Sequence, residues 1–238
     1  QVLQIGRGGE LTDGAQGKVG DRGEGVLLSC EGASGELSAA PHYSVTRFSA
    51  PNRLELTLSG VRKIDFDALF KSLLGTEAVR DAYRMMVLDD SSYGIVIVLN
   101  EGWSCEIPEY SDPGALMLNF IESAPSGEDE VYYLRSEAMT YTDELGLLCE
   151  EYHTEAATQL RTLSGEYIVT IGQYATRAEA EEALAALNET HGESGFFVAS
   201  GRPGTCQGII KDVELSAENH PVARGITCGI GDISLQRR

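Results

Sequence analysis

The residues that could perform acid–base or nucleophilic chemistry in this chain are its histidines, cysteines and adjacent carboxylates. Neither an HExxH nor a His-x-His spacing occurs, and the four histidines are expected to be surface or cap residues (His42, His153, His191 and His220). There is no GxSxG elbow and no CxxC pair. The sequence therefore predicts a protein that is not an enzyme and that needs no cofactor or metal ion.

Adjacent carboxylates occur at Asp89-Asp90, Glu128-Asp129-Glu130 and Glu150-Glu151, as expected by chance in an acidic chain. A glycosidase pair drawn from distant parts of the chain stays open as an alternative. Asp89-Asp-Ser-Ser lacks the spaced oxygen ligands of a calcium loop, so a solvated turn is preferred. Five scattered cysteines leave both buried thiols and one or two disulfides open (Cys30, Cys105, Cys149, Cys206 and Cys228).

The charge of the chain argues against two classes of partner. Its 238 residues include 18 basic and 37 acidic side chains, a net charge of −19. So few cations cannot neutralise a phosphate backbone, which excludes nucleic acid and disfavours anionic lipid.

No apolar run approaches the roughly 18 residues of a membrane span. The chain begins Gln1-Val-Leu-Gln, without Met or a secretory apolar segment, which favours a mature form that has lost a signal or anchor.

Two periodicities meet between Gly165 and Leu187. A strand pattern runs through Tyr167, Val169 and Ile171, and after Gly172 the pattern becomes helical, with one face carrying Ala180, Ala183, Leu184 and Leu187. Thr176 and Glu179 have the spacing of a capping box. The sequence therefore predicts a strand, a turn and a capped helix.

This βα unit resembles the opening of a SPOR (sporulation-related) domain, a small bacterial module that binds peptidoglycan. The resemblance rests on Ile171-Gly172-Gln173-Tyr174 and on Thr176-Arg177-Ala178-Glu179-Ala180-Glu181, over about 25 residues. It implies later strands at 196–198, 207–213 and 222–230, and a disulfide between Cys206 and Cys228, which flank the last two. It also implies the glycan-binding candidates Tyr167, Gln173, Tyr174, Phe197 and Arg202. For Tyr167 and Phe197 a place in the core under the helix stays equally open.

The N-terminal half is a series of predicted strands. Alternating residues predict strands at 43–48 and 54–59, followed by a helix at 64–74 and further strands at 83–88, 95–99, 103–107 and 115–121. The stretch from Pro51 to Gly60 resembles the strand entry of an AMIN domain, a β-sandwich module of bacterial envelope proteins. Trp103 is expected in the core. Ten glycines in residues 1–36 predict a flexible or turn-rich segment, and the apolar residues at 26–30 predict a strand.

Together these patterns predict an α+β protein in four parts. They are a Gly-rich segment (1–36), an AMIN-like β-sandwich domain (37–123), a linker with a connecting helix (124–163), and a βαβ-βαβ domain of SPOR or ferredoxin-like type (164–238). Within the linker, residues 131–134 predict a short strand and residues 137–163 a helix. The resemblances imply an extracytoplasmic protein of the bacterial cell envelope. It would bind peptidoglycan without catalysis and localise wall remodelling in sporulation or division. A protein-interaction scaffold without glycan binding and a subunit of a wall hydrolase remain as alternatives.

Overall fold

The computed structural model describes residues 2–4, 14–19, 25–32, 35–36, 38–61, 63–125 and 129–201. This part of the chain is α+β with mostly antiparallel strands, so the predicted fold class is confirmed at that level. The helices are α1 (Phe66–Leu74), α2 (Asp143–Glu151), the 3₁₀ turn η1 (His153–Glu155) and α3 (Arg177–His191). Within the described residues, no helix is both long and apolar enough to cross a membrane.

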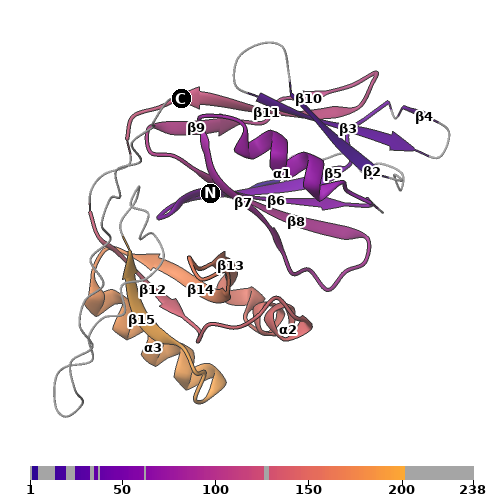
Figure 1. Ribbon diagram of the computed structural model, residues 1–238. Coiled ribbons are helices and arrows are strands. Elements are labelled where there is room, and N and C mark those ends of the chain that lie inside the picture. The colour runs from indigo at the N-terminus through magenta and orange to yellow at the C-terminus, as the bar shows by residue number, and fades with distance from the viewer. Residues whose placement is uncertain are drawn as a thin grey trace, which may run out of the picture.

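Two sheets form a β-sandwich (Figure 1). The central sheet has the order β1-β5-β6-β8-β7 and consists of β1 (Val2–Gln4), β5 (His42–Ser49), β6 (Asn52–Ser59), β8 (Ser92–Leu99) and β7 (Val79–Met85). The outer sheet has the order β10-β11-β3-β2, with β4 on β3 and β9 on β11. Its strands are β2 (Gly14–Val19), β3 (Gly25–Gly32), β4 (Gly35–Glu36), β9 (Trp103–Glu106), β10 (Glu109–Tyr110) and β11 (Ala115–Glu122).

The core of the sandwich is made by the inward-facing residues of both sheets. Leu54, Leu56 and Leu58 of β6 alternate inward, as period-two patterning requires, and contact a core that includes Val26 and Leu28 of β3. Helix α1 contributes Leu69 and Leu73 to the same core and contacts β2 and β7. Trp103 is partly buried against this core, as expected.

The Gly-rich segment was predicted to be flexible or turn-rich apart from a strand at 26–30, which is β3, and its other described residues form strands β1, β2 and β4. Strand β3 lies inside the outer sheet, between β11 and β2. Val26 and Leu28 are fully buried there. The burial of these two apolar side chains, on a strand that is paired along both edges, outweighs the preference of the surrounding glycines for turns.

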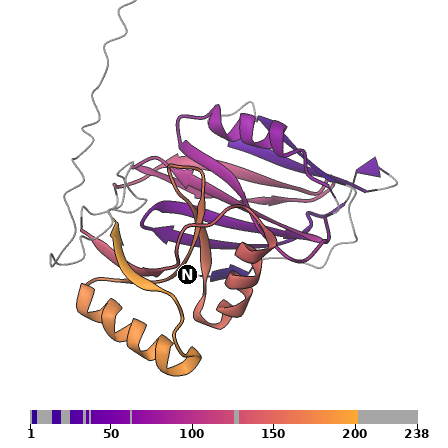
Figure 2. The ribbon, with the colours of Figure 1, turned by 60° about the horizontal axis from the view of Figure 1, so that its bottom comes forward.

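The third sheet belongs to a C-terminal unit, Val131–Gly201, that runs β-α-β-β-α-β. It consists of β12 (Val131–Arg135), α2, β13 (Thr158–Arg161), β14 (Tyr167–Tyr174), α3 and β15 (Phe197–Gly201), with the strand order β13-β14-β12-β15. Helix α3 lies on the side of this sheet away from the sandwich (Figures 1 and 2). The unit is therefore a four-stranded antiparallel sheet with both helices in its crossover connections.

Residues 124–163 were predicted to be a linker with a connecting helix, and the structure corrects this. Helix α2 stops at Glu151, the chain turns through η1, and Ala156 adopts a left-handed conformation (φ 56°) that no helix can continue. The strand predicted at 131–134 is β12 (131–135), and residues 158–161, predicted as part of the helix, form a strand of the same sheet. Consequently, the stretch from Gly165 to Leu187 is the second βα unit of the sheet, whereas the sequence analysis placed it first.

The predicted start of α3 is confirmed. The Thr176 hydroxyl accepts a hydrogen bond from the Glu179 N–H (3.2 Å), and the Glu179 carboxylate accepts one from the Thr176 N–H (3.1 Å). Ala180 and Leu187 are buried against the sheet. The strands expected at 207–213 and 222–230, and the pair Cys206 and Cys228, lie outside the described residues.

Strand β8 is buried on both faces, and each face belongs to a different core. Ile95, Ile97 and Leu99 belong to the core of the sandwich. Val96 and Val98 belong instead to a second core, shared with the C-terminal unit. The central sheet is thus the middle layer of three, with the outer sheet on one side and the C-terminal unit on the other (Figure 1).

Candidate ligand cavity between the two units

The face of the central sheet that meets the C-terminal unit carries a buried ion pair. On β6, the leucines point into the sandwich, so Arg53 and Glu55 take the opposite face. The Arg53 Nε lies 3.1 Å from a Glu55 carboxylate oxygen, and the guanidinium carbon lies 3.7 Å from the centre of the Phe48 ring. Only 2% of Arg53 is exposed. A cation removed from water to this extent is stable only with compensating charge and hydrogen bonds.

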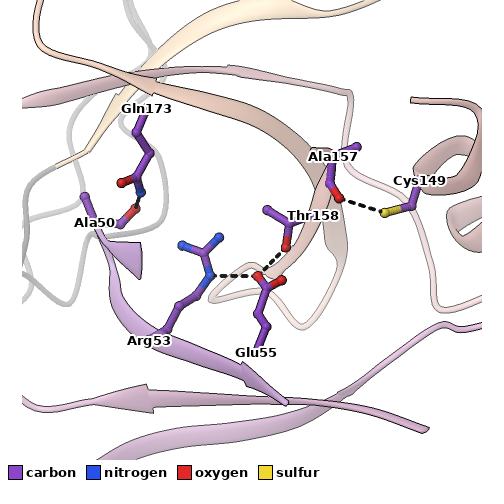
Figure 3. A network of polar contacts seen from close by, with 7 residues as sticks. All are labelled: Ala50, Arg53, Glu55, Cys149, Ala157, Thr158 and Gln173. Carbon is purple, nitrogen blue, oxygen red and sulfur yellow. Dashed lines mark hydrogen bonds and ion pairs between the residues drawn. The ribbon is translucent and has the colours of Figure 1, made fainter. Parts of the chain in front are cut away.

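Polar contacts across the interface hold the two units together, as Figure 3 shows. The Thr158 hydroxyl of β13 donates to the same Glu55 oxygen that pairs with Arg53. At the end of β14, the Gln173 amide nitrogen donates to the Ala50 carbonyl (2.7 Å). The Gln173 amide oxygen accepts from the Ser49 hydroxyl (3.3 Å). Strands β5 and β6 are therefore fixed against β13 and β14 by side chains of both units.

Between these contacts lies a cavity of about 330 Å³. This volume falls at the lower end of the range for small-molecule sites, about 300–1,000 Å³. One wall comes from β5, β6 and the turn joining them, and the other from the C-terminal unit. The lining residues are Thr46, Arg47, Phe48, Ala50, Arg53, Tyr133, Glu155, Ala156, Thr158, Leu160, Thr170, Gly172 and Gln173.

A β-bulge places Gln173 in this cavity. Along β12 and β14, Leu134 pairs with Ile171 and Tyr132 pairs with Tyr174, so β14 contains one residue more than β12 over this stretch. The extra position coincides with Gly172, whose φ of 70° favours glycine. Because the bulge reverses the alternation, Gln173 lines the cavity, whereas Ile171 and Tyr174 pack on the core shared with the helices.

Glu155 is the carboxylate that lines the cavity wall of the C-terminal unit. Hydrogen bonds from the Thr154 hydroxyl and from His191 hold the pKa of this carboxyl below its usual value. The His191 Nε2 lies 2.9 Å from a Glu155 oxygen. Glu155 is therefore ionised at neutral pH and already partnered within its own unit.

The two thiols described in the structure are poor nucleophiles. Burial raises the pKa of Cys105 to about 12 and that of Cys149 to about 11. Neither forms a disulfide. Across the described residues, no three His, Cys, Asp or Glu side chains gather as a metal site would require. The polar groups that line the cavity are hydrogen-bonding groups suited to holding a ligand.

Of the five glycan-binding candidates, the structure brings one to the cavity. Gln173 lines it, and Tyr174 next to it is partly buried against the helices. Tyr167 is 7% exposed and lies between the rings of Tyr83 and Tyr141 in the core. Phe197, on β15, packs against the guanidinium of Arg135 on β12. Arg202 is outside the described residues.

Sequence reasoning missed Arg53, Glu55 and Thr158. The strand at 54–59 was predicted from its alternation alone, with no role for Glu55, and Arg53 fell before its predicted start. One signal was available: the uninterrupted apolar run from Ile95 to Leu99 indicates a strand covered on both faces. The neighbouring strand must then be covered as well, which buries its charged face.

Comparisons with protein-family models, with curated proteins and with solved structures find no significant match to this chain.

Proposed function

We propose that this protein is a non-catalytic binding protein of the bacterial cell envelope that holds peptidoglycan glycan in the cavity between its two units. The observation that carries the proposal is the position of Gln173. It follows the strand glycine in the segment that resembles a SPOR domain, and its side chain lines the cavity. The β-α-β-β-α-β order of the C-terminal unit and its packing on a β-sandwich support the SPOR-like and AMIN-like assignments.

The contact between the units determines where a glycan would bind. The sheet face of the C-terminal unit that carries Thr158 and Thr170 packs toward β5 and β6, and both residues line the cavity, where a ligand could reach them. Hydroxyl and amide groups there suit the hydrogen bonds of a sugar. A protein of net charge −19 gains no long-range attraction to an anionic wall. Binding should therefore not weaken as the salt concentration rises, since there is no attraction for the salt to screen.

Sedimentation with isolated sacculi tests this proposal. The parent protein should pellet with the wall and release no muropeptides. Gln173→Ala should pellet at least severalfold less, because the amide at the cavity wall is lost. Glu182→Ala, an exposed change on α3, is the matched control and should pellet like the parent. A parent that stays in the supernatant with intact sacculi would refute glycan binding, and muropeptide release would indicate a wall hydrolase instead.

One observation favours a second candidate, an envelope scaffold without glycan binding. Both ends of the Gln173 amide already hydrogen-bond to β5 and the turn after it. A SPOR-like unit that uses this residue to dock on its own sandwich has one group fewer for a ligand. The same assay separates the candidates, since the scaffold would leave the sacculi intact and remain soluble.

A further inference from the structure

The guanidinium of Arg53 is buried beside the cavity, and its hydrogen bonding among the described residues is incomplete. Its Nε is taken by Glu55, but its Nη1 is buried and has no hydrogen-bond partner among the described residues. Arg53 lines the cavity. In Figure 3 its terminal nitrogens point away from Glu55, toward the strands of the C-terminal unit. Buried donors in folded proteins are almost always paired, so an unpaired one that faces a cavity points to a ligand atom.

We infer that Arg53 is the anchor for an uncharged amide, of the acetamido type, whose carbonyl oxygen accepts a hydrogen bond from Nη1. This inference rests on the proposed function and names the chemical group of the glycan that the cavity recognises. The N-acetyl group of an amino sugar is such an amide.

The charges around the cavity decide between a neutral and an anionic acceptor. Arg53 is already neutralised by Glu55 at 3.1 Å. The charge of Arg47, the other cation of the lining, is balanced by Glu155 on the opposite wall. A carboxylate or phosphate entering this space would be buried with an uncompensated charge, which is strongly unfavourable. A carbonyl oxygen satisfies the Nη1 donor without adding charge. The site therefore selects a neutral acceptor.

The remaining lining fits the rest of an acetamido group. Ala50, Ala156 and Leu160 provide apolar surface on both walls, which suits a methyl group. The amide N–H of the ligand needs an acceptor, and Glu155 and the Thr170 hydroxyl supply oxygens on the wall of the C-terminal unit. A carbonyl, an N–H and a methyl group each have a complementary neighbour in one cavity of about 330 Å³.

The test measures binding of soluble probes to the full chain by calorimetry or NMR titration. Tri-N-acetylchitotriose should bind saturably, whereas chitosan trimer, which lacks the acetyl groups, should bind at least tenfold more weakly. N-acetylalanine amide separates the sources of the amide: saturable binding would mean that an acetylated peptide serves as well as a sugar, and both results support an amide site. Tighter binding of acetate or phosphate than of the acetylated probes would overturn the inference.

Two variants tie the binding to Arg53. Arg53→Lys keeps the charge but shortens the donor reach and removes the planar fork, and it should weaken chitotriose binding at least tenfold. Arg177→Lys, the same substitution at an exposed position of α3, is the control and should bind like the parent. Thr46→Phe leaves Arg53 in place and fills the cavity from β5, so it should abolish binding even if Arg53→Lys does not fold.

The outcomes of these experiments separate this inference from the proposed function. If the parent pellets with sacculi but Arg53→Lys pellets equally well, the wall-binding proposal stands and the role of Arg53 is wrong. If the parent binds chitotriose through Arg53 but does not pellet with sacculi, the acetamido site stands and the wall is not its target. Absence of saturable binding by both acetylated probes in the folded parent refutes the site itself.

Discussion

The side-chain amide of Gln159 forms a reciprocal pair with the backbone of Met86. Its oxygen accepts from the Met86 N–H (2.8 Å), and its nitrogen donates to the Met86 carbonyl (2.8 Å). Met86 follows directly after β7, and Gln159 is buried in β13. A side chain of the C-terminal unit therefore supplies the two hydrogen bonds that a neighbouring strand would otherwise make, and it joins the sandwich to that unit.

Replacing Gln159 should destabilise the protein substantially. Gln159→Ala removes two hydrogen bonds and leaves two partly buried backbone groups of Met86 unpaired, which should cost about 2 kcal/mol or more. Urea unfolding followed by circular dichroism measures the change in the free energy of unfolding. The exposed control Glu182→Ala should stay within about 0.5 kcal/mol of the parent. Similar values for the two variants would mean that the pair contributes no stability.

Local sequence patterns predict those elements of this fold whose own residues determine them. The strands at 43–48 and 54–59 and the helix at 64–74 appear where alternation and helical spacing place them. The capping box at Thr176 is likewise fixed by two residues three positions apart. In each case most apolar side chains of the segment pack into a single core, so the period of the sequence is the period of the structure.

The patterns fail where a contact between distant segments decides the outcome. Residues 158–161 were predicted as part of a helix, and they form a strand because β14 offers an edge to pair with. The cavity depends on such contacts throughout. Arg53 and Thr158 are more than 100 residues apart, and nothing in either segment alone indicates that the C-terminal unit covers the charged face of β6.

The capping box of α3 should contribute measurable stability. Thr176→Ala removes the acceptor for the Glu179 N–H and should cost about 1 kcal/mol in the free energy of unfolding. Thr190→Ala in the same helix is a matched control, because its hydroxyl only donates back to the Ala186 carbonyl (3.1 Å). That change should be neutral or slightly stabilising, since alanine has the higher helix propensity. Equal losses in the two variants would contradict a specific role for the cap.

Among the glycines of the C-terminal unit, Gly172 at the bulge should be the least tolerant of substitution by alanine. A Cβ at this position would lie 2.4 Å from the Tyr174 hydroxyl oxygen, in addition to the strain of a side chain at a φ of 70°. Gly165 offers a matched control, because its φ is 88° but a Cβ there would have no other atom within 4 Å. Gly165→Ala should cost about 1–2 kcal/mol from backbone strain alone. Gly172→Ala should cost at least about 1 kcal/mol more, from the added overlap.

The double variant Gly172→Ala with Tyr174→Leu separates the two contributions at Gly172. Leucine removes the phenol that the new methyl group would meet, so the Gly172→Ala change made in the Tyr174→Leu background should cost only what it costs at Gly165. Urea unfolding of all four variants and the parent gives this double-mutant cycle directly. A cost at Gly172 that does not depend on Tyr174 would mean that backbone strain alone sets it. The bulge would then be held by Gly172 without help from the tyrosine packed over it.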